Sequence, residues 1–199
     1  MKATNCDISH PLAFFAEWLR APLRTAAVLP SGTQLAQRML QSLPTGRPRI
    51  IELGSGTGVF TKAMLRRGVQ AEDMFAVELN PRFHRLLSTN FPTIRCALGD
   101  ACALPVLAEE YLRQGLADVV MSGLGLRSMS VDMRFRIIGA AFACLKPGGC
   151  FVQFTYGRRF PLPLTRLKQL GLRARLVGRA WFNVPPANVY ALERVADRP

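Results

Sequence analysis

The chain is poor in the residues that hold metals or cross-link a small fold. Its 199 residues include only two histidines, far apart in the sequence, and five cysteines. The number of cysteines is odd, and no two of them have the C-x-x-C spacing of a zinc or redox site. We therefore expect neither a disulfide framework nor a metal centre, and we interpret the cysteines as small buried apolar side chains.

Long hydrophobic runs are also missing. Hydrophobic residues make up 49% of the chain, but the longest apolar stretches, such as residues 137–145, fall short of the ~18 residues that a membrane-spanning helix needs. Near the amino terminus, Asp7, His10 and Glu17 would interrupt the apolar core of a signal peptide. The length suits a single domain, residues 1–199, and we expect this domain in the cytoplasm.

Acidic residues are scarce relative to basic ones. The chain has 26 lysines and arginines against 13 aspartates and glutamates, a formal net charge of +13. The excess lies at the two ends: residues 157–199 have nine basic and two acidic residues, and residues 1–50 have six and two. Such a charge attracts polyanions, either nucleic acid or an anionic membrane surface. Charge alone does not choose between them, and a basic surface without a specific partner also remains open.

The most informative segment is an apolar strand, residues 50–53, that runs into a turn with three alternating glycines. These are Gly54, Gly56 and Gly58, with Ser55 between the first two. Glycine tolerates positive φ and leaves room for a ligand, so the pattern predicts a nucleotide-binding turn after a buried parallel strand. The spacing differs from the G-x-G-x-x-G of dinucleotide sites, and Glu52 would repel a pyrophosphate. The same carboxylate suits a cationic ligand, such as the amino acid part of S-adenosylmethionine.

Two more segments follow at suitable spacings. An apolar strand at residues 74–77 leads to Glu78 and Leu79, and Glu78 lies 20 residues past Gly58, where an acid is expected to bind ribose hydroxyls. After a strand at residues 94–98 come Asp100 and Ala101. The strand, acid and G-x-G-x-G unit resembles motif I of class I methyltransferases. That resemblance implies that S-adenosylmethionine is the cofactor, that S-adenosylhomocysteine is its product, and that Asp100 and Ala101 lie near the adenine.

Strands and helices alternate along most of the chain, which indicates a parallel sheet with right-handed crossovers. We predict strands at 50–53, 74–77, 94–98, 117–122 and 150–154, with helices at about 58–67, 81–90, 105–114 and from Asp132 through 145. Residues 146–149 should form a turn, and Ser31 should cap a helix that ends at 44–46. In the tail we expect a helix at 162–170 and strands at 173–177 and 189–194. The expected class is α/β, a Rossmann-like class I methyltransferase fold with a mostly parallel seven-stranded sheet and helices on both faces.

An amphipathic helix is predicted within residues 1–30, ahead of the first strand. Its apolar residues are Phe14, Phe15 and Trp18, and its basic residues are Arg20 and Arg24. One interpretation is that this helix covers the cofactor site or an edge of the sheet. The other is that it lies at a membrane surface, with the aromatic rings among the headgroups and the arginines on anionic lipid.

The residues after the fourth strand, Ser122, Gly123 and Leu124, are expected to face the methyl acceptor, and Ser122 is also expected to contact the cofactor. They lack the Asn or Asp, the prolines and the aromatic residue that adenine N6-methyltransferases use, although the cofactor half looks much like the ribosomal RNA dimethylases. Over roughly residues 12–195 the chain instead resembles the bacterial phospholipid N-methyltransferases of the PmtA type. The matching segments are 27–31, 52–61, 123–124, 153–157 and 183–190, and the most specific pieces are Gln153–Gly157 and 185–190.

This second resemblance implies methylation of the amine of phosphatidylethanolamine, in up to three rounds, by a peripheral protein of the inner membrane. Gly125 and Ser55 stand where the family has prolines, which leaves the number of rounds open. Tyr156 is the leading polar candidate near the acceptor and Tyr190 the second, with ordinary packing as the alternative for Tyr156. Arg158 and Arg159 would hold the lipid phosphate as charge-assisted donors, or form a solvated basic turn.

Three classes of function therefore remain after the sequence is read. The first is a lipid methyltransferase with an anionic membrane as its partner. The second is an RNA methyltransferase, which would require base-stacking aromatic residues beside the basic tail, where only Phe160, Trp181, Phe182 and Tyr190 are present. The third is a binding module without chemistry, which the complete set of acids and glycines disfavours. The sequence leaves the oligomeric state open.

Overall fold

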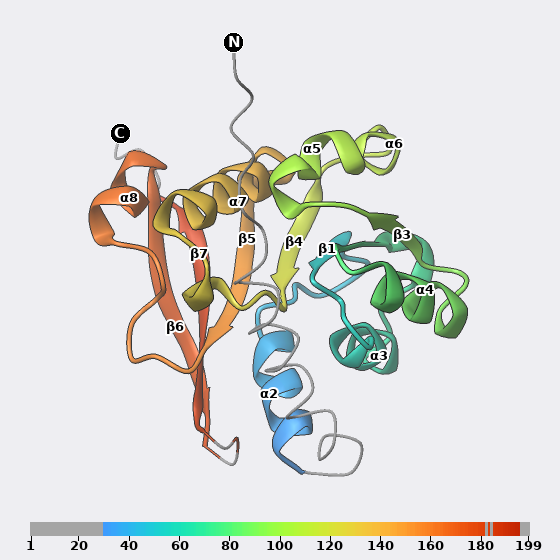
Figure 1. The fold of residues 1–199 in the computed structure, drawn as a ribbon, viewed down its shortest axis with the longest axis horizontal. Coiled ribbons are helices and arrows are strands. Elements are labelled where there is room, and N and C mark those ends of the chain that lie inside the picture. Colours follow the sequence, from blue (N-terminus) through green and yellow to red (C-terminus); the bar gives the residue numbers. More distant parts are fainter. Residues whose placement is uncertain (1–29, 182, 184, 196–199) are drawn as a thin grey trace.

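A computed structural model describes residues 30–181, 183 and 185–195, and in it seven strands form one sheet in the order β3-β2-β1-β4-β5-β7-β6 (Figure 1). The strands are β1 (Ile50–Leu53), β2 (Met74–Glu78), β3 (Arg95–Leu98), β4 (Ala117–Ser122), β5 (Leu145–Thr155), β6 (Leu172–Ala180) and β7 (Ala187–Arg194). The first five strands are parallel to one another, through the pairs β3–β2, β2–β1, β1–β4 and β4–β5, and β7 pairs antiparallel with both β5 and β6. The expected mostly parallel, seven-stranded Rossmann-like fold is confirmed.

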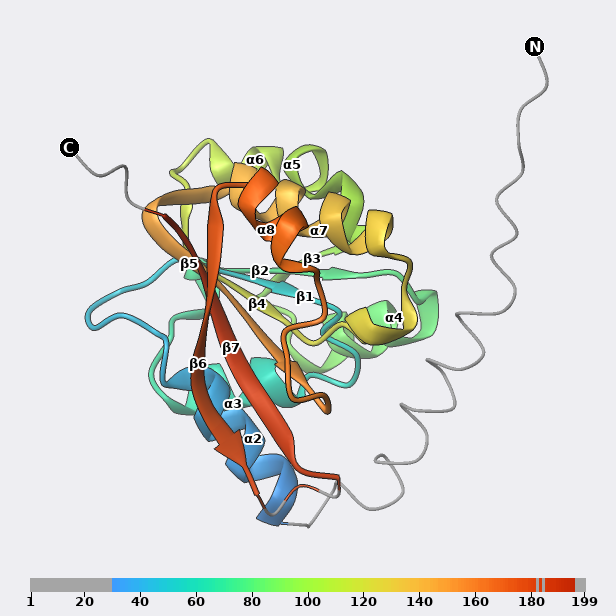
Figure 2. The same cartoon turned by 90° about the vertical axis from the view of Figure 1, so that its left-hand side faces the viewer.

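Helices cover both faces of the sheet (Figure 2). On one face lie α2 (Pro30–Leu40) and α3 (Val59–Arg66), with α4 (Pro81–Asn90) beside β3; on the other lie α5 (Leu104–Leu107), α6 (Glu109–Leu112), α7 (Val131–Ala143) and α8 (Leu164–Gln169). Within the described part of the chain, every helix is too short or too polar to span a bilayer.

The central strands β1, β2 and β4 are largely apolar because both of their faces are buried. Successive side chains of a strand point to opposite faces. Along β4, Val120 packs into the cluster beneath α7, whereas Val119 and Met121 pack into the cluster beneath α2. This double burial is typical of parallel sheets and explains the near-continuous hydrophobic runs of the sequence.

Several predicted boundaries are wrong. Ser130, not Asp132, caps α7, since its hydroxyl accepts the N–H of Met133 at 3.2 Å. Residues 146–149 belong to β5, which begins at Leu145 and contains a register shift opposite β4. The helix predicted at 105–114 is divided into α5 and α6 at Ala108.

The first helix that the structure describes begins earlier than the sequence predicts. α2 begins at Pro30, so Ser31 lies inside the helix rather than before it. Proline is well tolerated in the first turn because its missing N–H would have no partner there. The amphipathic helix expected earlier in the chain lies outside the described residues, together with Phe14, Phe15, Trp18, Arg20 and Arg24.

Candidate cofactor and acceptor site

The predicted cofactor residues lie at the carboxyl ends of the parallel strands. β1 leads through α3 to β2 on one side, and β4 pairs with β1 on the other. The chain therefore leaves β1 and β4 in opposite directions, which opens a crevice at this edge of the sheet. The glycine turn that follows β1 and the loop that follows β4 both lie at this point.

The glycine turn brings two backbone segments into close approach. Gly54, Gly56 and Gly58 have φ values of 68°, 53° and 81°, a region that other residues rarely adopt. A Cβ on Gly54 would lie 2.6 Å from Leu124 Cδ2, and a Cβ on Gly123 would lie 2.7 Å from the carbonyl oxygen of Gly54. Larger side chains would fill the space between the turn and the β4 loop, so the two segments form a narrow, glycine-lined cradle.

Glu52 is a buried carboxylate beneath this cradle. Its side chain is 1% exposed, its Oε2 accepts a hydrogen bond from the Thr61 hydroxyl at 2.6 Å, and its Oε1 has no partner within the described residues. Burial raises the pKa of Glu52 to about 7. The buried hydroxyl of Ser55 likewise has no hydrogen-bond partner among these residues. Unpaired buried acceptors of this kind are suited to a ligand that brings its own N–H donors.

Glu78 connects β2 to the glycine turn. One of its carboxylate oxygens accepts the N–H of Gly56 and the other accepts the N–H of Asn80, both at 2.8 Å. Each oxygen retains a second lone pair, so the same carboxylate can also accept a ribose hydroxyl. The backbone N–H of Gly99 donates to the Glu78 carbonyl at 3.0 Å, which places Asp100 at the same edge of the sheet. Asp100 itself accepts the N–H of Cys102 at 2.8 Å.

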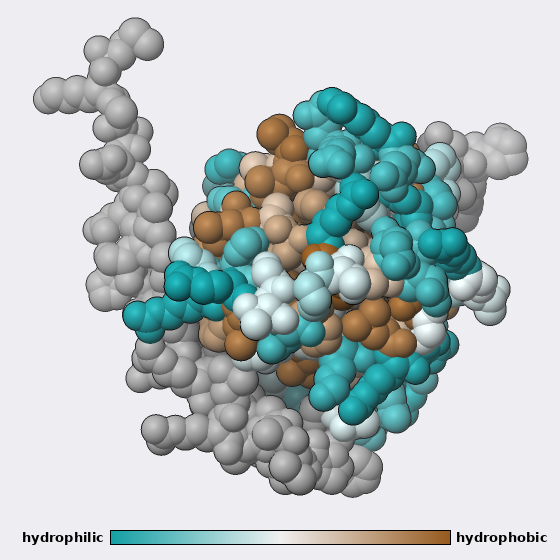
Figure 3. Space-filling view, turned by 90° about the vertical axis from the view of Figure 1, so that its right-hand side faces the viewer, coloured by the Kyte–Doolittle hydropathy of each residue, from teal (hydrophilic) through white to brown (hydrophobic). Residues whose placement is uncertain are grey.

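Apolar surface lies next to these acids, at the ends of β2 and β3. Leu79 is 51% exposed and Leu98 is 48% exposed. Figure 3 views the molecule from the side of β3 and α4, where apolar surface appears among hydrophilic side chains. An exposed leucine beside a buried carboxylate provides an apolar surface on which a flat nucleobase can pack.

Together these residues match the chemical groups of S-adenosylmethionine. Glu52 is suited to the ammonium group, the glycine cradle to the rest of the amino acid part, Glu78 to the ribose, and Leu79, Asp100 and Ala101 to the adenine. When bound, this cofactor supplies a methyl group on a positively charged sulfur, ready for transfer to a nucleophile. Of the predicted cofactor residues, Ser122 lies deepest, fully buried at the end of β4, where its hydroxyl accepts the N–H of Leu124 at 3.4 Å.

The predicted acceptor segments meet on neighbouring strands. Thr155 at the end of β5 pairs with Asn188 at the start of β7, and Gln153 pairs with Tyr190. The Gln153 side chain donates to the Leu124 carbonyl at 2.9 Å, which links β5 to the loop after β4. Its Oε1 is buried without a partner among the described residues. The segments 153–157 and 185–190 and the loop that starts at Gly123 therefore form one continuous region.

The two candidate tyrosines differ in their surroundings. The ring of Tyr156 meets Phe154 edge-on, with centroids 5.7 Å apart. Burial raises the pKa of Tyr156, and a side-chain hydrogen bond with Asn183 acts in the opposite direction. The Tyr190 hydroxyl donates to the Arg158 carbonyl at 2.7 Å. This contact favours a role for Tyr190 in positioning the loop over a direct role in the reaction.

Several residues of the site were not singled out from the sequence. Thr61, the partner of Glu52, lies nine residues later on α3, and only its polarity within an amphipathic helix hints at a role. Asn183 and Asn188 fall within segment 183–190, which resembles the phospholipid N-methyltransferases, but their contacts depend on the pairing of β5 with β7. Asn188 Nδ2 donates to the Gly157 carbonyl at 2.8 Å. Arg158 and Arg159 are exposed, and neither forms an ion pair with any described residue.

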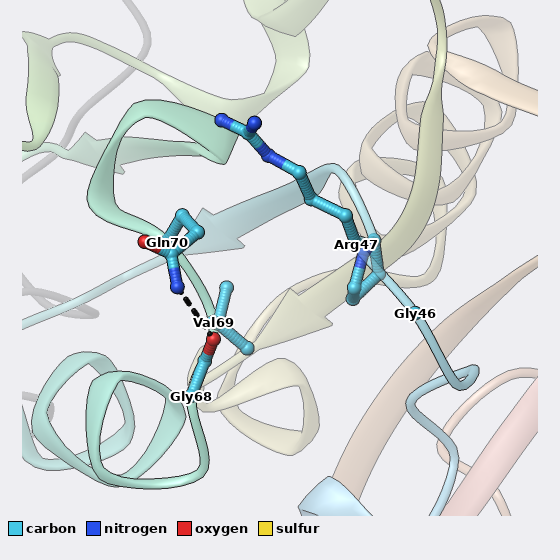
Figure 4. Close-up of a pocket in the computed structure, with 6 residues that line it drawn as sticks. Gly46, Arg47, Gly68, Val69 and Gln70 are labelled. Atoms are coloured by element: carbon cyan, nitrogen blue, oxygen red, sulfur yellow. Dashed lines mark hydrogen bonds between the residues drawn. The ribbon is translucent and has the colours of Figure 1, made fainter.

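A separate cavity of about 330 Å³ lies at the other edge of the sheet (Figure 4). Its lining residues precede β1 and β2; they are Gly46, Arg47, Pro48, Gly68, Val69 and Gln70. Gln70 Nε2 donates to the Gly68 carbonyl at 3.0 Å, and Arg47 forms an ion pair with Asp73. Because it lies at the amino ends of the strands, this cavity is distinct from the cradle formed by the glycine turn.

Comparison with known proteins agrees with this geometry. Residues 50–149 match the methyltransferase domain family. An ornithine lipid N-methyltransferase from Singulisphaera acidiphila is 28% identical over 147 residues, which cover 71% of this chain and 76% of that protein.

Solved structures of methyltransferases share the fold at low identity. Magnesium protoporphyrin IX methyltransferase from Synechocystis, with bound S-adenosylmethionine, has a TM-score of 0.66 at 10% identity, over 96% of this chain and 100% of that one. A TehB-like methyltransferase from Corynebacterium glutamicum has a TM-score of 0.62 at 15% identity, over 94% and 98% of the two chains. The chain belongs to the methyltransferase domain family, and it is an S-adenosylmethionine-dependent methyltransferase.

Proposed function

We propose that this enzyme methylates the primary amine of phosphatidylethanolamine at the surface of an anionic membrane. The main support is the pairing of β5 with β7, which joins the two segments most specific to phospholipid N-methyltransferases, 153–157 and 185–190. They meet at the carboxyl edge of the sheet, next to the loop that starts at Gly123. The similarity to a lipid N-methyltransferase supports a lipid amine as the acceptor.

In this proposal the protein acts mainly by positioning the amine. Methyl transfer requires a neutral amine aligned with the methyl group at short distance, and alignment alone contributes much of the rate. The amine arrives as an ammonium, and a desolvated site next to positive charge favours its neutral form. Gln153 Oε1, which is buried without a described partner, and the Tyr156 hydroxyl are the acceptors that we assign to the amine N–H groups.

The membrane partner is supported by charge and by one exposed aromatic residue. The net charge of +13 favours an anionic surface. Trp181 follows β6, is 60% exposed, and has the guanidinium of Arg179 4.5 Å above its ring. Because Ala180 pairs with Ala187, at the start of β7, this turn lies at the same edge as the acceptor segments. We place the enzyme peripherally on the cytoplasmic face of the inner membrane, with residues 14–24 as a further contact.

Two other acceptors define the alternatives. Ornithine lipid is a second candidate, because the similar protein from Singulisphaera acidiphila is an ornithine lipid N-methyltransferase. An RNA substrate has less support. Of the described aromatic residues in the basic tail, Phe160 is buried, Tyr190 is half-buried, and Trp181 alone is well exposed, so little surface is available for stacking bases.

Mass spectrometry of the methylated product tests the proposal. The protein is incubated with S-adenosylmethionine and vesicles that contain an anionic lipid plus either phosphatidylethanolamine or ornithine lipid, with ribosomal RNA in a parallel reaction. Mass gains of one to three methyl groups on phosphatidylethanolamine are expected. Methylation of ornithine lipid alone would identify that lipid as the acceptor. Methylated RNA with unchanged lipids would refute the proposal of a lipid acceptor. Reactions without S-adenosylmethionine are the control.

A further inference from the structure

Arg127 connects the loop after β4 to the loop after β5. It lies in the short turn Leu126–Ser128, four residues past Gly123. A Cβ added at Gly157 would overlap the Nη1 atom of Arg127 and would lie 3.0 Å from its Cζ atom. The guanidinium therefore packs directly on the backbone of Gly157, at the edge of the sheet where the acceptor segments meet.

This guanidinium has no carboxylate partner among the residues that the structure describes. Arg127 forms no ion pair with any residue that the structure describes, and the same is true of Arg158 and Arg159, which directly follow Gly157. A fourth arginine, Arg134, donates to the Arg127 carbonyl at 3.0 Å. Burial and the positive charge of Arg127 together lower the pKa of Arg134. Arg127 and Arg134 thus lie close together, Arg158 and Arg159 directly follow the glycine that Arg127 contacts, and none of the four forms an ion pair with a described carboxylate.

Three other arginines in the same half of the chain form ion pairs. Arg166 contacts Asp132 at 2.9 Å, and Arg173 and Arg175 both contact Glu193, at 3.0 and 2.8 Å. Since like charges repel most strongly where solvent is partly excluded, an unpaired group of arginines is disfavoured unless an anion joins it. An anionic ligand can supply the counter-ion that these arginines lack among the described residues.

The backbone of the two loops that carry these arginines is held in place by hydrogen bonds. From β7, Asn188 Nδ2 donates to the Gly157 carbonyl and the Tyr190 hydroxyl donates to the Arg158 carbonyl. Arg134 fixes the other loop through the carbonyls of Arg127 and Pro161, the latter at 2.9 Å. Arginines on an ordered backbone bind planar or tetrahedral oxyanions well, because less conformational freedom is lost on binding.

We propose that Arg127, together with Arg158, binds the anionic group of the methyl acceptor and so selects amines that carry an acidic group nearby. The inference builds on the proposed function, for which it names the property of the acceptor that is recognised. The phosphodiester of phosphatidylethanolamine and the carboxylate of ornithine lipid both satisfy it. Arg127 is in this view a specificity-determining residue that touches the substrate.

Calorimetric titration of soluble headgroups tests the site without relying on turnover. The probes are glycerophosphoethanolamine, which has the phosphodiester, Nα-acetylornithine, which has the carboxylate, and ethanolamine, which has no anion; each is titrated into the full chain saturated with S-adenosylhomocysteine. We expect one or both anionic probes to bind more tightly than ethanolamine. Arg127→Ala should weaken that binding by roughly tenfold or more and leave ethanolamine unchanged, because a charge-assisted hydrogen bond is lost. Arg127→Lys should lie between the two.

The matched control is Arg66→Ala. Arg66 is an exposed arginine at the end of α3 and has no ion pair among the described residues, so this variant also removes one positive charge, away from the acceptor edge. It should bind all three probes like the unmodified protein. Arg127 is exposed and its side chain makes no hydrogen bond to a described residue, so thermal unfolding should be unchanged in both variants.

Three results would overturn the anion site. They are equal binding of all three probes, no binding of any probe, and equal weakening of all three by Arg127→Ala. The outcomes for the proposed function are separate. Arg127-dependent binding of a headgroup without methyl transfer to either lipid would refute the proposed function and leave the anion site in place. Lipid methylation that is unaffected by Arg127→Ala would refute the site and leave the function in place.

Discussion

The carboxylate of Glu78 accepts the backbone N–H of Gly56 at 2.8 Å, across 22 residues of sequence. The acid expected to bind the ribose is thereby bonded to the turn expected to bind the amino acid part of the cofactor. The second oxygen of Glu78 accepts the N–H of Asn80, so the side chain also shapes the start of α4. The two halves of the cofactor site are thus coupled through a single carboxylate.

Glu78→Gln should weaken cofactor binding and destabilise the fold. Glutamine keeps one oxygen but places an N–H₂ group where the other backbone N–H donates, so a buried donor loses its acceptor. We expect a loss of about 1–3 kcal/mol in the free energy of unfolding and a roughly tenfold increase in the Kd for S-adenosylmethionine. Urea unfolding and calorimetry measure the two effects. Glu109→Gln, at an exposed ion pair with Arg113, is the control and should change neither quantity.

Glu52 should make the stability of the protein depend on pH. Its pKa is raised from the ordinary value of 4.5 to about 7 in the folded protein. Between these pH values the unfolded chain binds fewer protons, so the contribution of Glu52 to the free energy of unfolding falls as pH rises from 4.5 to 7 and is level above that. The fall is at most about 1.4 kcal/mol per pH unit.

Glu52→Gln isolates this effect, because the amide oxygen can still accept from Thr61. The stability of the variant relative to the unmodified protein should rise between pH 4.5 and 7, the window set by the raised pKa. Urea unfolding at intervals of half a pH unit measures the difference. Parallel pH profiles for the two proteins would mean that Glu52 is not held in its neutral form.

Gly123→Ala should close the space between the two loops. The added Cβ would lie 2.7 Å from the carbonyl oxygen of Gly54, and neither backbone can move aside easily. Crowding of this kind costs about 1–3 kcal/mol, and binding of S-adenosylmethionine should fall with it. Gly139→Ala is the control, since its Cβ would make an ordinary 3.8 Å contact with Leu170 and alanine suits the interior of α7. Equal effects in the two variants would contradict the close approach.

Much of the fold was predictable because its signals are local. The alternation of apolar strands and amphipathic helices identified every strand of the sheet, and the helix predicted at 81–90 matches α4. The errors lie where a tertiary contact decides the boundary. β5 extends back to Leu145 through a lysine, a proline and two glycines because Leu145 pairs with Ala117 of β4, and that pairing cannot be read from the composition of a turn.

The cofactor residues were likewise predictable, because motif spacing places them at one edge of the sheet. The acceptor side was less so. The contact of Arg127 with Gly157 joins positions 30 residues apart, and the hydrogen bond from Tyr190 to Arg158 spans 32. The first contact depends on the parallel pairing of β4 with β5, and the second depends on the antiparallel pairing of β5 with β7. Neither pairing can be predicted from a local sequence pattern. That Arg127 forms no ion pair with a described acid is also a property of the folded chain.

Trp181→Ala should weaken binding to vesicles that contain an anionic lipid. Indole rings favour the interface between headgroups and acyl chains, and burying an aromatic side chain contributes about 1.5–3 kcal/mol, so partial insertion of this exposed ring predicts a roughly tenfold weaker affinity. Vesicle sedimentation measures it. Leu164→Ala is the control, because Leu164 is 75% exposed on α8, at the opposite end of β6 (Figure 2). Unchanged binding of Trp181→Ala would move the membrane contact away from the β6–β7 turn and leave residues 14–24 as the segment to test.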